Sequence, residues 1–203
     1  MNARETLAQH GQSVWLDDMR RSTTRGGELT ALLGQGLRGL TSSPATLHTA
    51  IKEDKEYAER LSVLVATPDQ STSDIYECLV LQDVREAADA LLPVYEGSGG
   101  VDGYVSLELA PSLARDPEGT IEQARRLWTA VARPNLMLKV PGTPEGLPAI
   151  EVLVGEGINI DVTMIFSRGA YHCIAEAFIV GAERWLASGG DGSRLASLAS
   201  FSV

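Results

Sequence analysis

Residues 158–166 have the sequence Ile158-Asn159-Ile160-Asp161-Val162-Thr163-Met164-Ile165-Phe166, in which apolar and polar side chains alternate as in a β-strand. This period of two places the even-numbered residues on one face and Asn159, Asp161 and Thr163 on the other. A strand of a doubly wound parallel sheet meets helices on both faces and is apolar throughout, whereas the inward face of an α/β barrel becomes polar toward its catalytic end. The stretch therefore predicts a barrel strand whose polar face does chemistry.

The rest of the chain alternates strand-like and helix-like stretches. Strands are also expected at 14–18, 39–44, 104–110 and 135–141, with a last apolar stretch at 195–203. Helices are expected at 22–33, after the strand that ends at Pro44 through about residue 61, and at 72–92, 116–131 and 144–155. A further helix is expected on the stretch that carries Ile174, Phe178, Gly181 and Trp185. Strands separated by helices pair in parallel, so the predicted fold is an α/β barrel, with residues 1–203 forming a single domain.

The apolar run at residues 135–141 carries a lysine, Lys139, and predicts a buried strand. The chain has only three lysines against fourteen arginines, and Lys52 and Lys55 lie in a charged, solvated stretch. Burial disfavours an ammonium group and favours the neutral amine, which attacks carbonyl groups. The alternative is a lysine that reaches from the strand end to a surface carboxylate, and the run by itself leaves both interpretations open.

The same alternation places further polar residues on strand faces. Glu108, Asp17 and Lys139 each lie opposite apolar neighbours on their strands, and Ser43 lies near the end of its strand. Barrel enzymes gather catalytic groups at the carboxyl ends of their strands. One lysine with several carboxylates suits an imine mechanism, in which the lysine attacks a ketone and the carboxylates move protons. Such chemistry needs no metal or organic cofactor.

Charge and composition argue against other classes of function. The net charge of −10 and the sequence pI near 4.8 do not favour nucleic-acid binding, which draws on clustered cations. No signal sequence and no run of eighteen apolar residues is present, so we expect a cytoplasmic protein without membrane insertion. His10, His48 and His172 are dispersed and form no recognisable metal-ligand set.

Over essentially its whole length, the chain resembles transaldolases of the bacterial, Schiff-base type, with a long insertion between the second and third strands. Five stretches carry this resemblance in family order, the two around Lys139 and Thr163 being the more specific: Ser13-Val14-Trp15-Leu16-Asp17-Asp18, Gly39-Leu40-Thr41-Ser42-Ser43-Pro44, Asp102-Gly103-Tyr104-Val105-Ser106-Leu107-Glu108, Pro134-Asn135-Leu136-Met137-Leu138-Lys139-Val140-Pro141 and Gly157-Ile158-Asn159-Ile160-Asp161-Val162-Thr163-Met164-Ile165-Phe166-Ser167.

The resemblance implies a catalytic role for each of four residues. Lys139 would form the Schiff base with a three-carbon ketol unit, and Asp17 would take the hydroxyl proton whose loss breaks the carbon–carbon bond. Glu108 and Thr163 would move protons through a bound water. The implied enzyme is a cofactor-free transferase of the pentose phosphate pathway. It passes a dihydroxyacetone unit from fructose 6-phosphate or sedoheptulose 7-phosphate to an aldose phosphate, so its partners are phosphorylated sugars.

The chain departs from the family pattern at three positions near the expected substrate. Ser43 replaces an asparagine, Asp161 replaces another, and Ser202 stands where the family has an aromatic residue two positions after the serine that matches Ser200. Asp161 accepts hydrogen bonds but does not donate when ionised, and its charge would favour a protonated Schiff base. Ser43, Asp161 and Ser200 are therefore expected to bind substrate with an altered geometry.

Length is a further departure, because the resemblance implies a TIM (β/α)8-type barrel and about six of its eight strands are visible. The chain ends before the family's phosphate-binding arginines, so we expect a shortened chain, a homo-oligomer or partner that completes the barrel, or another way of closing it. Arg20, Arg21 and Arg25 follow the first strand and either reach an anion or form a solvated helix start.

Other functions also fit the sequence. A specialised transaldolase would make an unusual sugar phosphate for a secondary pathway, which Ser43 and Asp161 favour. A catalytically silent, transaldolase-like binding subunit would explain the missing barrel end. A barrel aldolase that releases the ketol unit to water is a third alternative.

Overall fold

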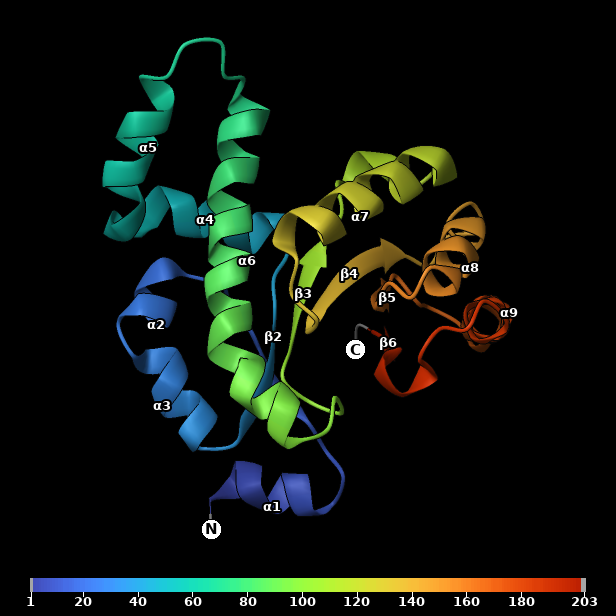
Figure 1. The fold of residues 1–203 in the computed structure, drawn as a ribbon. Helices are drawn as coiled ribbons and strands as arrows, with labels where there is room; N and C mark the ends of the chain where they lie inside the picture. The colour runs from blue at the N-terminus through green and yellow to red at the C-terminus, as the bar shows by residue number, and fades with distance from the viewer. Residues whose placement is uncertain (1, 202–203) are drawn as a thin grey trace. The chain divides into compact units, whose positions relative to one another are not determined.

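The computed structural model describes residues 2–201 and divides the chain into two compact units, Met1–Val105 and Ser106–Val203, each of which is described by itself. Helices and strands alternate along both units, as the sequence predicts (Figure 1). Among residues 2–201 there are six strands, which confirms the expected α/β fold class with six of the eight strands of a barrel. None of the described helices is long and apolar enough to cross a membrane.

The first unit begins with α1 (Ala3–Gln9) and a pair of parallel strands, β1 (Val14–Asp17) and β2 (Leu37–Thr41). In their register Asp17 lies opposite Thr41. Trp15 packs over Gly39 so closely that a Cβ atom there would lie 2.2 Å from the indole ring. The absence of a side chain at Gly39 therefore leaves room for the indole against β2.

Two short helices connect these strands, where the sequence predicted one helix over residues 22–33. They are α2 (Arg21–Arg25) and α3 (Glu28–Gly34), separated by Gly26 and Gly27. Gly27 has a φ of +83°, a left-handed conformation that glycine adopts without a steric penalty. The prediction of a single helix was wrong because this residue ends the helical path.

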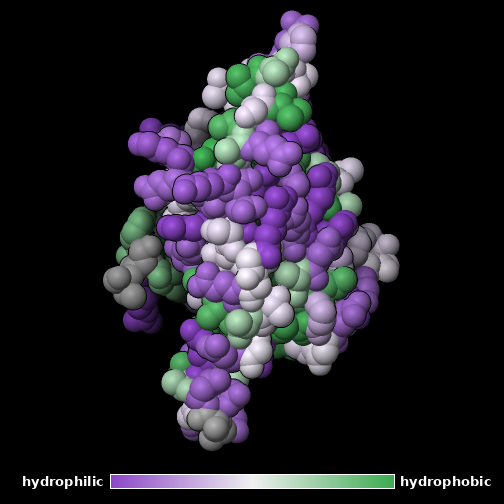
Figure 2. Space-filling view, turned by 90° about the vertical axis from the view of Figure 1, so that its left-hand side faces the viewer, coloured by the Kyte–Doolittle hydropathy of each residue, from purple (hydrophilic) through white to green (hydrophobic). Residues whose placement is uncertain are grey.

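A helical segment follows β2 and consists of α4 (Pro44–Glu53), the 3₁₀ helix η1 (Lys55–Tyr57), α5 (Ala58–Val65) and α6 (Thr72–Gly97). α6 runs through Pro93 to Gly97, beyond its predicted end at Leu92. A small core of Ala50, Tyr57, Leu64 and Leu79 holds the segment together. Figure 2 shows mainly hydrophilic residues on this side of the molecule, with hydrophobic surface toward the top, where Figure 1 places α5.

The second unit carries most of β3 (Tyr104–Glu108), which spans the unit boundary, and the strands β4 (Leu136–Pro141), β5 (Ile160–Thr163) and β6 (Ser197–Ala199). β4 pairs with β5 and β5 pairs with β6, in both cases in parallel. The connections are η2 (Pro111–Leu113), α7 (Pro117–Val131), α8 (Leu147–Gly155), α9 (Arg168–Ala187) and η3 (Gly192–Arg194). The helix predicted to open at Asp116 does so, because the Asp116 carboxylate accepts a hydrogen bond from the amide of Gly119.

β5 is shorter than the predicted strand at 158–166. Met164 has a φ of +63°, which takes the chain out of the extended region directly after Thr163. Met164 and Phe166 are 47% and 75% exposed, so the prediction that they pack on the apolar face with Val162 was wrong. The predicted apolar face holds as far as Val162, because Ile158 is 3% exposed and Ile160 and Val162 are fully buried.

Candidate active site

Lys139 lies near the carboxyl end of β4, between Leu138 and Val140, whose side chains are fully buried. Its own side chain is 14% exposed, and Nζ lies 3.7 Å from Oε2 of Glu108 on β3. The backbone joins the same two strands, because the amide of Leu109 donates to the Lys139 carbonyl over 3.2 Å. The structure thus gives Lys139 features of both interpretations, a largely buried amine and a carboxylate within ion-pair distance.

Asp161 lies opposite Lys139 in the register of β4 and β5 and is only 2% exposed. Its Oδ2 accepts a 2.8 Å hydrogen bond from Ser106 Oγ, and its Oδ1 accepts a 2.6 Å hydrogen bond from Ser200 Oγ. A buried carboxylate is costly unless its oxygens are hydrogen-bonded. The two hydroxyl groups meet this need and tie β3 and the residue after β6 to β5.

The sequence did not single out Ser106 as a site residue. It is fully buried on β3, two residues before Glu108, and therefore lies on the same face of the strand as that carboxylate. The spacing to Glu108 was the available signal. Serine alone is too common in strands and turns for the bond to Asp161 to be foreseen.

The other two polar residues of the 158–166 stretch lie at opposite ends of β5. Thr163 is half-buried opposite Pro141, and its carbonyl accepts a 2.8 Å hydrogen bond from the amide of Gly142. Asn159 donates from Nδ2 to the carbonyl groups of Pro134 and Leu136, while its Oδ1 accepts from the amide of Ala196 over 2.9 Å. Asn159 therefore holds backbone segments together, and Thr163 lies at the end where Lys139 is found.

Asp17 and Ser43 belong to the first unit. Asp17 is exposed and occupies the last position of β1, at the carboxyl end of the strand. Ser43 is the N-cap of α4, where its Oγ accepts from the amide of Thr46 over 3.2 Å and its own amide donates to Thr46 Oγ1 over 2.9 Å. The described bonds of Ser43 are those of a helix cap. Ser202 lies outside the described residues.

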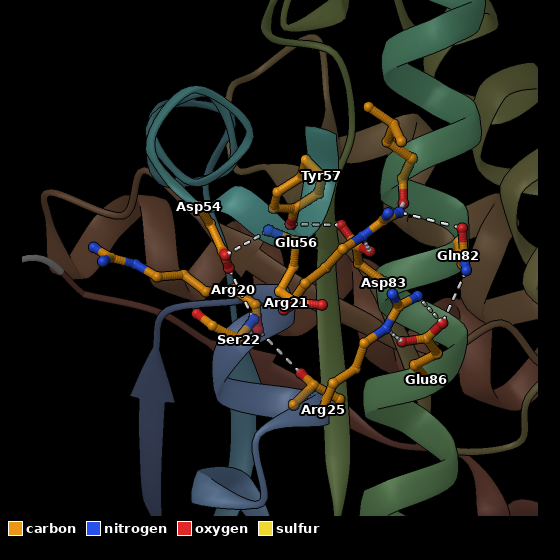
Figure 3. Close-up of polar contacts among 12 residues, drawn as sticks. Arg20, Arg21, Ser22, Arg25, Asp54, Glu56, Tyr57, Gln82, Asp83 and Glu86 are labelled. Carbon is orange, nitrogen blue, oxygen red and sulfur yellow. Dashed lines mark hydrogen bonds and ion pairs between the residues drawn. The ribbon is translucent and has the colours of Figure 1, made fainter. Parts of the chain in front are cut away.

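The three arginines after β1 all have acidic partners, and Figure 3 shows those of Arg21 and Arg25. Arg20 pairs with Asp18 at 3.0 Å, and Arg25 pairs with Glu86 at 2.7 Å. Arg21 is 1% exposed and pairs with the buried carboxylate of Asp83 at 2.5 Å. The expectation of a solvated helix start was wrong for Arg21, and these pairings do not favour the alternative of an anion site.

Burial dominates the electrostatics around Arg21. It raises the pKa of Asp83 above the usual range of a carboxyl group, against the opposing hydrogen bonds from Tyr57 and Arg21. Burial and the neighbouring charge of Asp83 also raise the pKa of Tyr57. The phenol therefore stays protonated and donates its 2.7 Å hydrogen bond to Asp83 Oδ2.

Across residues 2–201, no group of three or more His, Cys, Asp or Glu residues is placed to hold a metal ion.

Comparison with known proteins matches residues 14–203 to the family described as transaldolase/fructose-6-phosphate aldolase. The chain is 45% identical to a transaldolase of Trichodesmium erythraeum over 192 residues, which cover 94% of this chain and 50% of that protein. It is 43% identical to a transaldolase of Thiobacillus denitrificans over 202 residues, covering 99% and 56% of the two chains. A transaldolase of Thermobifida fusca is 44% identical over 200 residues, covering 98% and 54%. The chain thus spans about half the length of the curated relatives it matches.

Proposed function

Because the chain belongs to the transaldolase/fructose-6-phosphate aldolase family, we propose that it is a transferase that moves a dihydroxyacetone unit from a ketose phosphate to an aldose phosphate. The observation that carries the proposal is the 3.7 Å approach of Lys139 Nζ to the Glu108 carboxylate. The same proposal includes a cytoplasmic location. It also treats residues 1–203 as one partial barrel domain.

The first half of the proposed reaction takes place at Lys139. The neutral amine attacks the ketone carbon, a nitrogen–carbon bond forms, and the nitrogen proton passes to the oxygen to give a carbinolamine. Protonation of that hydroxyl group and loss of water give the protonated imine. A separation of 3.7 Å is beyond direct hydrogen bonding, and a bridging water between Glu108 and Nζ would carry these protons, with the Thr163 hydroxyl as its further partner.

The second half breaks the carbon–carbon bond. Asp17 takes the proton of the hydroxyl group next to the bond, an aldehyde leaves, and the electron pair flows into the protonated imine to form an enamine. The enamine then attacks the acceptor aldehyde, and water releases the new ketose from Lys139. The role of Asp17 is supported by the family resemblance and by its position at the end of β1.

A second candidate function is a specialised transaldolase with a different donor or acceptor sugar, and Asp161 is the residue that favours it. The carboxylate replaces the amide of the family pattern and is held by two hydroxyl groups, at 2.8 and 2.6 Å. Both oxygens are occupied as acceptors, so the group offers substrate a negative charge where an amide would donate. A change in the sugar hydroxyl groups that fit beside Lys139 follows from this difference.

Reductive trapping tests the proposed function. Borohydride is added with fructose 6-phosphate or sedoheptulose 7-phosphate, and the modified peptide is identified by mass spectrometry. We expect a covalent adduct on Lys139 that is absent in Lys139→Ala and retained in Lys55→Ala, whose lysine lies outside the site. A sugar that binds without giving an adduct would contradict the imine mechanism and favour a silent binding subunit.

A set of acceptor aldehydes then separates the enzymatic alternatives. Formation of a new ketose phosphate with erythrose 4-phosphate or glyceraldehyde 3-phosphate supports housekeeping transaldolase activity. Product formation only with other aldehydes supports the specialised enzyme, and release of free dihydroxyacetone in their presence supports an aldolase.

A further inference from the structure

α2 is held at several points by the helical segment that follows β2 (Figure 3). At its start, the amide of Ser22 donates to Asp54 Oδ2 over 2.8 Å. Near its end, Arg25 binds Glu86 of α6 through Nε and Nη2, at 2.8 and 2.7 Å. A five-residue helix has too few internal hydrogen bonds to be stable alone, so these outside contacts fix its place.

One of these contacts is buried. Arg21, the first residue of α2, donates from Nε to Asp83 Oδ1 at 2.5 Å and from Nη2 to Gln82 Oε1 at 3.2 Å. Its guanidinium group lies over the Tyr57 ring at 4.4 Å, and Tyr57 Oη donates to the second oxygen of Asp83. Both carboxylate oxygens are therefore engaged, and Figure 3 shows Arg21 enclosed between Tyr57 and α6. An arginine held by Asp83, by Gln82 and by the face of the Tyr57 ring permits little movement of the helix start.

β1 depends on this anchoring more than the strands around Lys139 do. It has four residues, none of them fully buried, whereas four of the six residues of β4 are buried. Its amino end is held by Ser13 Oγ, which donates to Asp102 at 2.5 Å. At its other end, only residues 18–20 separate Asp17 from Arg21. A movement of the start of α2 would therefore also move the end of β1.

We propose that Tyr57 and Asp83 are positioning residues for the reaction, which act through Arg21 to hold the β1–α2 connection and thereby the carboxylate of Asp17. This inference rests on the role of Asp17 in the proposed function. It also gives a role to the helical segment between the second and third strands, which contacts α2 through Asp54, Tyr57, Asp83 and Glu86.

Hydrogen exchange tests the positioning without any need for activity. The variants Asp83→Asn and Tyr57→Phe are compared with the unchanged protein and with Leu91→Ala, which empties a fully buried position on the same helix away from Arg21. We expect exchange of the amides at 18–25 to rise about tenfold or more in Asp83→Asn, and less in Tyr57→Phe, which keeps the ring beneath the guanidinium. Equal exchange of these amides in Asp83→Asn and Leu91→Ala, at matched global stability, overturns the proposal.

Kinetics test the consequence for the reaction. We expect kcat for transfer to fall about 10- to 100-fold in Asp83→Asn, with KM and adduct trapping on Lys139 retained, because binding and imine formation precede the step assigned to Asp17. The double variant Tyr57→Phe/Asp83→Asn should be no slower than Asp83→Asn, since both residues act through Arg21. If Asp83 had only a structural role, Asp83→Asn would instead lower the fraction of active protein, which is the result expected for Leu91→Ala.

The outcomes separate this inference from the proposed function. If the unchanged protein gives no adduct on Lys139 although sugar binds, the proposed function fails, and hydrogen exchange still decides whether Asp83 fixes the start of α2. If the unchanged protein is active and Asp83→Asn keeps its full kcat, the proposed function stands and the positioning role is wrong.

Discussion

Ser200 Oγ donates a 2.6 Å hydrogen bond to Oδ1 of Asp161, a residue that precedes it by 39 positions in the chain. Ser106 occupies the other oxygen from β3. The pair of hydroxyl groups keeps a negative charge inside the second unit, opposite Lys139 in the sheet register. The buried acid is thus held from both sides, and Lys139 lies opposite it on the neighbouring strand.

Substitution of Asp161 should show how much its two hydrogen bonds contribute to the free energy of unfolding. Asp161→Ala is expected to lower the free energy of unfolding by about 2–4 kcal/mol, because the buried Ser106 hydroxyl and the half-buried Ser200 hydroxyl both lose their carboxylate partner. Asp161→Asn should cost less than about 1 kcal/mol, since a serine hydroxyl can rotate to accept from the new amide. Urea unfolding measures both free energies, and Ser200→Ala is the matched variant that loses only one of the two hydrogen bonds. An Asp161→Ala variant no less stable than Ser200→Ala would contradict the prediction.

Removal of the charge at Glu108 should slow imine formation. In Glu108→Gln, we expect the rate of adduct accumulation on Lys139 to fall about 10²- to 10⁴-fold, the range for loss of a general acid–base group. Time-resolved borohydride trapping measures this rate. Glu122→Gln changes an exposed acid on α7 and serves as the control. An unchanged trapping rate in Glu108→Gln would remove Glu108 from the proton-transfer steps.

The contribution of Glu86 to stability should depend on pH. The hydrogen bond from Arg25 lowers the pKa of Glu86 in the folded protein, against a smaller opposing effect of burial. The stabilisation is therefore present above the unfolded pKa of about 4.3 and is lost as the pH falls through the lower folded pKa. Glu86→Gln should be about 0.5–1 kcal/mol less stable than the unchanged protein at pH 7. Urea unfolding of both proteins from pH 7 to pH 3 should show this difference shrinking, and a constant difference would argue against the assignment.

Two glycine substitutions should have opposite effects on stability. Gly157 has a φ of +76°, and a Cβ atom there would lie 2.7 Å from the Trp185 ring, so Gly157→Ala is expected to cost about 1–3 kcal/mol. Gly34 lies in α3 with no atom within 4 Å of an added Cβ, so Gly34→Ala should stabilise by up to about 1 kcal/mol. Thermal unfolding of both variants checks the signs. A stable Gly157→Ala protein would show that Trp185 can move aside.

Much of the fold follows from local patterns. Alternation around Lys139 predicts buried neighbours on β4, and Leu138 and Val140 are indeed fully buried. The Asp116-Pro117 pair correctly predicts the start of α7. Alternation failed beyond Thr163, where the positive φ of Met164 ends β5, because a sequence period carries no information about a single residue leaving the extended region.

The sequence by itself therefore determined the α/β class, the strand that carries Lys139 and the polar face on which Asp161 and Thr163 lie, because these depend on neighbours one or two positions away. Only the tertiary structure decided which groups meet. Ser106 reaches Asp161 across 55 residues, and Arg21 reaches Asp83 across 62. Such pairs depend on strand register and helix packing, which bring together side chains that no local period relates.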